Sequence, residues 1–359
     1  MAELIVKTEK IARNIRKINE YLSKNGIVWT LVLKVLSGNR KILESLLGDS
    51  IVKNFHSFGD SRLSSLKTIK QINSELRTML IKPPSVRSVK SVIKWADISV
   101  NTSLPTLHAL DEEARKQKKI HKVMIMIELG ELREGVMREQ LVKFYDEVFN
   151  LKNIEMIGLG TNLGCMYGIE PTYDKLIQLG IYRELLEAKF NRSLPLISGG
   201  SSITLPLIPQ KKIPRAVNHF RIGEAVFFGV SPLENKKFLN LSTDTFEVEA
   251  SIIEQYRKKL VPDGNTSEAG IGKTSSFSDE DYGARQRRAI VDFGIIDADY
   301  SNLTPRDKKI SFIGTTSDMT VYEVPEGKRY TVGNTVKFKP NYMATAQLLN
   351  SKFTKVVIT

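Results

Sequence analysis

The feature that most constrains the fold is an alternation of short apolar runs with helical patterns over roughly 220 residues from the N-terminus. Each apolar run is short, rich in β-branched or bulky side chains and flanked by turn residues, which is typical of a buried parallel strand. The second of these runs spans residues 51–58. In the helical segment 8–24, Ile11, Ile15 and Ile18 form one stripe. Eight such units predict a (β/α)8 TIM-like barrel, and a doubly wound sheet is the alternative.

The pattern changes after position 229. Apolar runs, the first at 246–253, then follow one another without long helices between them. We therefore expect an α/β protein with a barrel over residues 1–229 and a C-terminal β-rich domain over residues 230–359. Residues 1–7 are a candidate additional strand of the second domain. Residues 262–286 are rich in Gly, Ser, Thr, Asp and Glu, which predicts an extended loop.

Composition and charge set the class of protein. With 359 residues, 41% of them hydrophobic and 26% charged, the chain can bury a large core, and disorder is not expected. The net charge of +13 allows an anionic partner, but the basic residues are spread along the chain and no basic tract is interleaved with aromatic residues. We therefore expect a solvated basic surface and no nucleic-acid partner. Nucleic-acid binding stays an alternative that rests on charge alone.

Cysteine usage and hydropathy indicate the compartment. The single cysteine, Cys165, cannot form an internal disulfide, which is typical of the reducing cytoplasm. The N-terminus shows no secretory signal, and no apolar run approaches the length of a transmembrane helix. We therefore expect a cytoplasmic protein with no membrane partner.

In a TIM barrel, catalytic and binding residues follow the C-terminal ends of the strands. Lys34 ends the first run, where it either carries chemistry or marks the exit of the strand into water with a solvated amine. Arg133 follows the fifth run and Asn162 the sixth. The sequence Ser198-Gly-Gly-Ser-Ser202 predicts a turn after the seventh run, and Arg221-Ile-Gly-Glu224 follows the eighth.

The predicted Ser198–Ser202 turn offers backbone amides and hydroxyl groups to a phosphate, which TIM barrels often bind after strands seven and eight. Most Gly-Ser turns bind nothing, so the neighbouring Arg221 strengthens this interpretation. Arg133 and Arg221 would both point to the barrel mouth, where arginines can orient an anionic or heteroaromatic ligand. Together with Lys34, these groups indicate pyridoxal 5'-phosphate as the cofactor, and no metal site is indicated.

The strand-end motifs belong to a longer series that extends over nearly the whole chain. The series is Leu33-Lys34-Val35, Gly59–Leu63, Glu128–Gly135, Gly160–Leu163, Ser198–Ser202, Phe220–Glu224, Asp292–Asp297, Leu303–Asp307, Ser317-Asp318 and Asn341-Tyr342. In content and order it resembles the alanine/ornithine racemase family of fold-type III pyridoxal-phosphate enzymes, and the ornithine-racemase-like branch in particular. No single motif is specific to this family, but the complete series is.

The resemblance implies a role for each strand-end residue. Lys34 would form the Schiff base with the cofactor and transfer a proton at the substrate. Arg221 would face the pyridine nitrogen, and Arg133 the phenolic oxygen. Asn162 stands where alanine racemases have a histidine against the ring. The phosphate would be held by Ser202, by Ser201, Gly223 and Glu224 through backbone amides, and by Tyr342 of the C-terminal domain.

The chain departs from the alanine racemase pattern at the second proton-transfer group. Alanine racemases use a tyrosine of the partner subunit in a Gly-Tyr pair, where this chain has Gly294-Ile295, and isoleucine cannot transfer a proton. The candidates for a substitute are Cys165, Asp297 and Asp318. For the cysteine the alternative is a small buried residue, and for the two aspartates it is a turn or capping role.

The function implied is racemisation of an amino acid by a homodimer with shared active sites. Ornithine is preferred by resemblance, with lysine, arginine, alanine or a broad range of amino acids as alternatives. A basic substrate calls for a carboxylate near its terminal ammonium, and the candidates are Glu131, Glu134, Asp297 and Asp318. A D-amino-acid lyase or aldolase of the same fold is a further alternative. Its metal site in the C-terminal domain would need histidines, and the sequence has none beyond His219.

Overall fold

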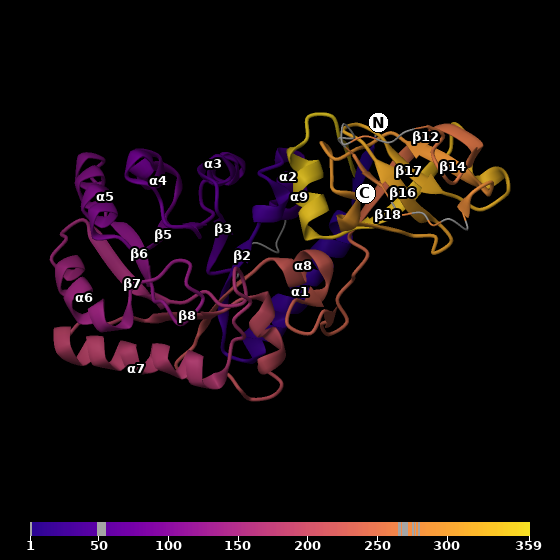
Figure 1. The fold of residues 1–359 in the computed structure, drawn as a ribbon. Helices are drawn as coiled ribbons and strands as arrows, with labels where there is room; N and C mark the ends of the chain where they lie inside the picture. The colour runs from indigo at the N-terminus through magenta and orange to yellow at the C-terminus, as the bar shows by residue number, and fades with distance from the viewer. Residues whose placement is uncertain are drawn as a thin grey trace. The chain divides into compact units, whose positions relative to one another are not determined.

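The chain forms two compact units in a computed structural model, one of Lys10–Thr243 and one of Met1–Glu9 together with Asp244–Thr359 (Figure 1). Each unit is described by itself. The sequence predicts a boundary between two independently folding domains at positions 229 and 230, and this boundary stays a prediction. The predicted run 51–58 and the predicted loop 262–286 lie partly outside the described residues. The structure describes residues 2–48, 55–264, 267, 272–274, 276, 278 and 281–359.

The first unit is a closed barrel of eight parallel strands, because its last strand, β9, pairs with its first, β2. Leu31 of β2 lies between Ile222 of β9 and Phe58 of β3. The predicted (β/α)8 barrel is therefore confirmed. The doubly wound alternative is wrong because such a sheet has two unpaired edges. The barrel strands are β2 (Val28–Val32), β3 (Ser57–Asp60), β4 (Thr78–Leu80), β5 (Ile98–Asn101), β6 (His121–Met126), β7 (Ile154–Gly160), β8 (Leu196–Gly200) and β9 (His219–Ile222).

Helices lie outside the barrel strands, as Figure 1 shows for α3 to α7. Helix α1 buries Ile11 and Ile15 of its apolar stripe, and Met79, Val100 and Met124 contribute to a core cluster of the barrel. Among the described residues, no helix is both long enough and apolar enough to cross a membrane. The helices are α1 (Thr8–Lys24), α2 (Arg40–Leu47), α3 (Leu63–Ile72), α4 (Val89–Trp95), α5 (Leu104–Lys116), α6 (Leu141–Phe149), α7 (Tyr173–Phe190) and α8 (Glu224–Phe228); a ribbon of β10 (Val230–Ser231) and β11 (Lys236–Lys237) follows.

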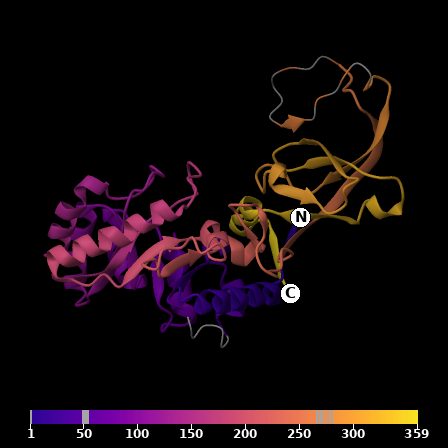
Figure 2. The same ribbon diagram turned by 90° about the horizontal axis from the view of Figure 1, so that it is seen from below.

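The second unit is rich in strands, as predicted, and Figure 2 shows those of the C-terminal third of the chain from below in orange to yellow. Strand β1 pairs antiparallel with β12 and parallel with β19, so residues 3–6 belong to this sheet. Buried residues alternate with partly exposed ones along the first half of β12, since one face of the sheet covers a core. The elements are β1 (Glu3–Val6), β12 (Phe246–Lys259), β13 (Lys273–Thr274), β14 (Arg285–Val291), β15 (Leu303–Pro305), β16 (Ser311–Thr315), β17 (Thr320–Glu323), β18 (Thr335–Pro340), α9 (Tyr342–Asn350) and β19 (Lys355–Ile358).

Two strand ends of the barrel differ from the prediction. Ser198–Gly200 belongs to β8 rather than to a turn, and the chain leaves the strand only at Ser201. A Cβ on Gly200 would lie 2.2 Å from the ring of Phe220 in β9, so this glycine makes room for a neighbouring side chain. Arg221 likewise lies within β9 rather than after it, because the strand continues to Ile222.

Candidate active site

Lys34 lies just beyond the C-terminal end of β2, where it opens a short 3₁₀ helix, Lys34–Leu36. The chain then turns at Ser37 and Gly38, whose φ angles are 52° and 69°. A Cβ on Gly38 would lie 2.9 Å from Ser65 Oγ, so glycine permits this close turn. The turn leaves Lys34 exposed at the C-terminal end of the barrel.

Helix α8 begins beside this lysine. Burial raises the pKa of Glu224, its first residue, and the positive charge of Lys34 acts in the opposite direction. Gly223 precedes the helix, and a Cβ there would lie 2.9 Å from the backbone oxygen of Val32. The close approach of α8 to the end of β2 therefore depends on a glycine at position 223.

Ser201 and Ser202 follow β8 at the same end of the barrel. Ser201 caps the 3₁₀ helix Ser202–Leu207, and its backbone N–H donates to Thr204 Oγ1 at 3.2 Å. Ser202 Oγ accepts a hydrogen bond from the backbone N–H of Ala225 at 3.1 Å. The hydroxyl group of Ser202 thus joins the end of β8 to the start of α8.

Arg221 is 8% exposed and donates hydrogen bonds to two neighbouring strand ends. Its Nη2 lies 2.6 Å from the backbone oxygen of Thr161, and its Nη1 contacts the backbone oxygen of Ser198 at 3.2 Å and also the hydroxyl of Ser198. Burial lowers the pKa of Arg221 to about 10, while Glu134 raises it and Arg133 lowers it. Arg221 therefore stays charged at neutral pH in a fixed position.

Arg133 lies in the loop after β6. Its Nε and Nη2 pair with the carboxylate of Glu134, which raises the pKa of Arg133. Its Nη1 lies 2.6 Å from Sγ of Cys165, in the loop after β7. Cys165 is exposed, so the interpretation of this cysteine as a small buried residue is wrong.

Glu131 joins the same two loops. Its side chain is buried, and its Oε1 accepts the backbone N–H groups of Cys165 and Tyr167 at 3.0 and 2.7 Å. Its Oε2 accepts those of Gly164 and Ile169 at 3.0 and 3.2 Å. Burial acts to raise the pKa of Glu131, but the four hydrogen bonds outweigh it and hold the pKa below its usual value. A carboxylate with four donors already bound is poorly suited to the substrate-binding role suggested by the sequence.

Tyr342, Asp297 and Asp318 belong to the second unit, whereas Lys34 belongs to the first. Tyr342 is the first residue of α9. Asp297 Oδ2 accepts the backbone N–H of Gly294 at 3.3 Å, and Asp318 Oδ1 accepts the hydroxyl of Ser317 at 3.1 Å. Both aspartates thus have the local hydrogen bonds of turn residues.

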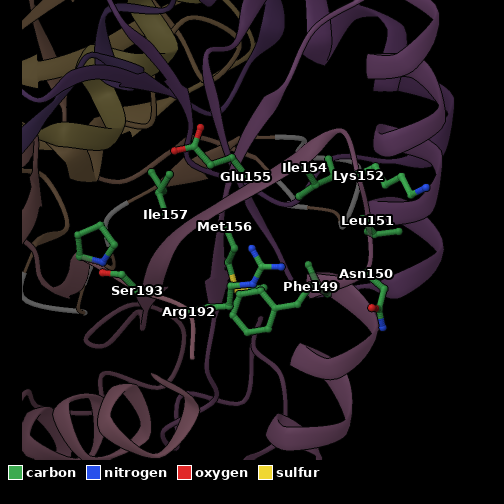
Figure 3. A pocket seen from close by; sticks show the side chains of 12 residues that line it. Phe149, Asn150, Leu151, Lys152, Ile154, Glu155, Met156, Ile157, Arg192 and Ser193 are labelled. Atoms are coloured by element: carbon green, nitrogen blue, oxygen red, sulfur yellow. The ribbon is translucent and has the colours of Figure 1, made fainter. Parts of the chain in front are cut away.

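A cavity of about 650 Å³ lies at the other end of the barrel strands (Figure 3). Its lining includes Lys152 and Glu155 near the start of β7, and Arg192 and Pro195 just before β8. Because these residues precede the strands or begin them, the cavity is not part of the site around Lys34. In TIM barrels this end contributes to stability rather than to catalysis.

Comparisons with known proteins agree with the strand-end geometry. The family model described as alanine racemase, N-terminal domain, matches residues 6–232. Ornithine racemase of Acetoanaerobium sticklandii is 33% identical over 353 residues, which are 98% of this chain and 98% of that protein. The chain belongs to the alanine racemase family. Lysine racemase of Thermotoga maritima is 31% identical and covers 99% of this chain and 97% of its own length.

The fold of the alanine racemase family extends over the whole chain. The crystal structure of alanine racemase from Bartonella henselae with covalently bound pyridoxal phosphate superposes with a TM-score of 0.72. The match covers 100% of this chain and 99% of that chain at 14% sequence identity, so it shows the shared fold alone. The family and the fold class predicted from the sequence are therefore confirmed.

The barrel residues fit a planar cofactor that carries a phosphate, a phenolic oxygen and a ring nitrogen. Nδ2 of Asn162 is buried and has no hydrogen-bond partner in the part of the chain that the structure describes, so a donor is available to an acceptor atom. The guanidinium group of Arg221 and the hydroxyl of Ser202 lie at neighbouring strand ends. The amine of Lys34 is exposed at the same end of the barrel, and an amine is the nucleophile that an aldehyde requires.

The strand-end pattern does not predict the groups that hold the site in place. The sequence suggests Glu131 only as a substrate ligand, because its hydrogen-bond partners lie more than 30 residues away in the chain. The sequence does contain a signal that His219 belongs to the site. His219 lies two residues before Arg221 on one strand, and the two side chains therefore lie on the same face. Both side chains are buried.

Proposed function

We propose that this protein is a racemase that interconverts the L- and D-enantiomers of a basic amino acid, with ornithine as the first candidate substrate and lysine as the second. The observation that carries the proposal is the similarity to an ornithine racemase and a lysine racemase over nearly the complete chain. The position of Lys34 at a strand end of a closed barrel supports it.

The predicted enzyme class and cofactor, an amino-acid racemase that uses pyridoxal phosphate, are confirmed by the family. When bound, this cofactor withdraws electrons from the α-carbon of the amino acid and so makes its proton acidic. Lys34 would hold the cofactor covalently, Arg221 would lie at its ring nitrogen and Arg133 at its phenolic oxygen. The phosphate would be held by Ser201, Ser202, Gly223 and Glu224, and Asn162 would donate to the ring substituents.

The chain's own residues would divide the proton transfer. The amine of Lys34 removes or returns the α-proton on one face of the substrate. Arg221 is buried and cationic, so it would disfavour a proton on a ring nitrogen next to it. The cofactor would then withdraw electrons less strongly, which would favour return of the proton over side reactions.

The second proton-transfer group we propose is Cys165. Its thiol is exposed and lies 2.6 Å from Nη1 of Arg133, the residue that would face the phenolic oxygen of the cofactor. Asp297 and Asp318 are the alternatives, but both already accept hydrogen bonds within their own turns.

We propose that the protein is a homodimer with shared active sites and that it is located in the cytoplasm. The turn that replaces the family's Gly-Tyr pair exposes apolar side chains, with Ile295 37% and Ile296 73% exposed. Exposed apolar residues of this kind are typical of a surface that a partner covers. Sedimentation as a monomer with full activity would exclude shared sites.

The function is tested by adding pyridoxal phosphate to the purified protein and to Lys34→Ala. We expect a visible absorption band in the wild type that the variant lacks. Chiral chromatography then follows L-ornithine, L-lysine, L-arginine and L-alanine. A racemase converges on equal amounts of both enantiomers with no loss of amino acid, whereas a lyase or a decarboxylase consumes the amino acid. If neither D-ornithine nor D-lysine is formed, the proposal is refuted.

A further inference from the structure

Behind Arg221, the barrel contains a chain of hydrogen-bonded polar side chains. The hydroxyl of Ser198 lies 2.7 Å from Nδ1 of His219, and Nε2 of His219 lies 2.9 Å from Thr30 Oγ1. Thr30 Oγ1 lies 2.7 Å from Ser57 Oγ, which in turn lies 3.2 Å from Nδ1 of His56. From Arg221 outwards, the hydrogen-bonded side chains are those of Arg221, Ser198, His219, Thr30, Ser57 and His56.

Strand register brings these side chains together. His219 of β9 lies opposite Ser198 of β8. Thr30 of β2 lies opposite Arg221 on one side and Ser57 of β3 on the other. The side chains of Thr30, Ser57, Ser198 and His219 are completely buried. Apolar residues could fill the same space, as they do elsewhere in this barrel, and buried polar groups cost free energy unless they are paired. This series of hydrogen-bonded side chains therefore calls for a function beyond packing.

The guanidinium group determines the direction of the hydrogen bonds. Arg221 can only donate, so the hydroxyl oxygen of Ser198 accepts from it. The hydroxyl proton of Ser198 needs an acceptor, and Nδ1 of His219 is the one within reach among the described residues. Burial, together with the charge of Arg221, holds the pKa of His219 well below its usual value, so the ring is neutral.

A neutral ring carries one N–H, so His219 is protonated at Nε2 and donates to Thr30 Oγ1. Beyond Thr30 either hydroxyl of the Thr30–Ser57 pair can donate, and Sδ of Met79 is a further acceptor for both, at 3.5 and 3.9 Å. The links from Arg221 through Ser198 and His219 to Thr30 thus run in one direction, away from Arg221. Hydrogen bonds in such a chain polarise and strengthen one another.

We propose that His219 is a positioning residue that fixes the guanidinium of Arg221 through the hydroxyl of Ser198. With Nδ1 as acceptor, the proton of Ser198 points at the ring and its lone pairs face Arg221. With a proton on Nδ1, His219 would compete with Arg221 for the same lone pairs. The catalytic part of this inference rests on the proposed function, in which Arg221 lies at the cofactor ring.

The first test is the tautomer of His219, which can be read without any activity. The chain has four histidines, so ¹⁵N-histidine NMR of the full-length protein gives few signals. The signal that His219→Asn removes and His121→Asn retains is assigned to His219. We expect Nε2 to carry the proton and Nδ1 to be an acceptor, with and without pyridoxal phosphate. A proton on Nδ1, or on both nitrogens at neutral pH, would overturn the inference.

The second test compares two buried histidines. His121 also contacts a serine hydroxyl, with its Nε2 2.8 Å from Ser99 Oγ, but none of its hydrogen bonds in the described structure leads to Arg221. We expect His219→Phe to lower kcat about five- to tenfold, the effect of losing one hydrogen bond, with KM unchanged. His219→Asn keeps an acceptor for Ser198 and should restore part of kcat.

The matched control, His121→Phe, should lower the melting temperature and leave kcat and KM unchanged. The visible absorption band of the loaded enzyme should shift in His219→Phe only. If both phenylalanine variants change kcat equally, His219 acts through stability alone and the inference fails. If the wild type racemises nothing, the proposed function fails, while the NMR result still decides the direction of the hydrogen bonds.

Discussion

Asp60 ends strand β3 with a side chain that is 1% exposed. Its Oδ1 accepts the backbone N–H of Arg62 at 2.8 Å, whereas Oδ2 is buried with no partner among the residues that the structure describes. Burial raises the pKa of this carboxyl to about 6 against the hydrogen bonds that favour its charged form. The folded protein therefore binds a proton at Asp60 more tightly than the unfolded chain does.

The raised pKa of Asp60 makes the stability of the fold depend on pH. A carboxyl whose pKa is higher in the folded than in the unfolded state contributes stability at low pH, which is lost as the pH rises from about 4 to about 6. Asp60→Asn keeps an acceptor for Arg62 without the charge. We expect it to raise the free energy of unfolding by about 3 kcal/mol at pH 7 and to change it little at pH 4. Urea unfolding at the two pH values measures this, and an equal effect at both would contradict it.

Cys165 leads to a prediction about one face of the substrate. Cys165→Ala should lower racemisation at least about 100-fold, the typical contribution of a general acid or base. Lys34 still exchanges the proton on its own face, so in D₂O one enantiomer should take up deuterium without inversion. Mass spectrometry after chiral separation measures this uptake. Racemisation at the wild-type rate would exclude Cys165, and Cys165→Ser controls for side-chain size.

At the scale of elements, Glu131 joins the loop after β6 to the loop after β7. Glu131→Gln replaces one carboxylate oxygen by an NH₂ group, so two of the four backbone donors at residues 164–169 lose their acceptor. We expect the free energy of unfolding to fall by about 2–4 kcal/mol, and limited proteolysis to cut first within residues 164–169. Glu139→Gln, at an exposed glutamate nearby, should change neither.

The elements that the sequence could predict are those with a local signal. Helix α1 has the predicted bounds, 8–24, because periodic apolar residues define it. The Ser198–Gly200 segment was mistaken for a turn because the reason for Gly200 is the ring of Phe220 on another strand. The role of Glu131 and the exposure of Cys165 also depend on contacts between distant loops, which no local pattern encodes.

At the scale of the whole molecule, acid stability should depend on buried neutral histidines. Burial, aided by nearby cations, lowers the pKa of His56 to about 4; burial also lowers that of His121 to about 4, with Asp97 opposing it. In the unfolded chain both take up protons at about pH 6.5, so stability is present above that pH and is lost as the pH falls towards 4.

His121 should contribute about 3 kcal/mol to this loss, and His56 should contribute less because it is partly exposed. The dependence is opposite in sign to that of Asp60. Denaturant unfolding between pH 7 and pH 4 measures it, with His121→Asn as the comparison. A variant with the same slope as the wild type between these values would contradict the assignment.

The pairing of β1 with β12 and β19 also affects how the chain is made. Strand β1 leaves the ribosome long before the strands that pair with it, because β12 begins only at Phe246 and β19 only at Lys355. Barrel strands β2 to β9 pair with neighbours that are synthesised next, apart from the closing contact. The barrel can therefore assemble during translation while β1 waits for its partners. A fusion partner that keeps β1 from pairing would leave the barrel folded and the sheet of the second unit incomplete.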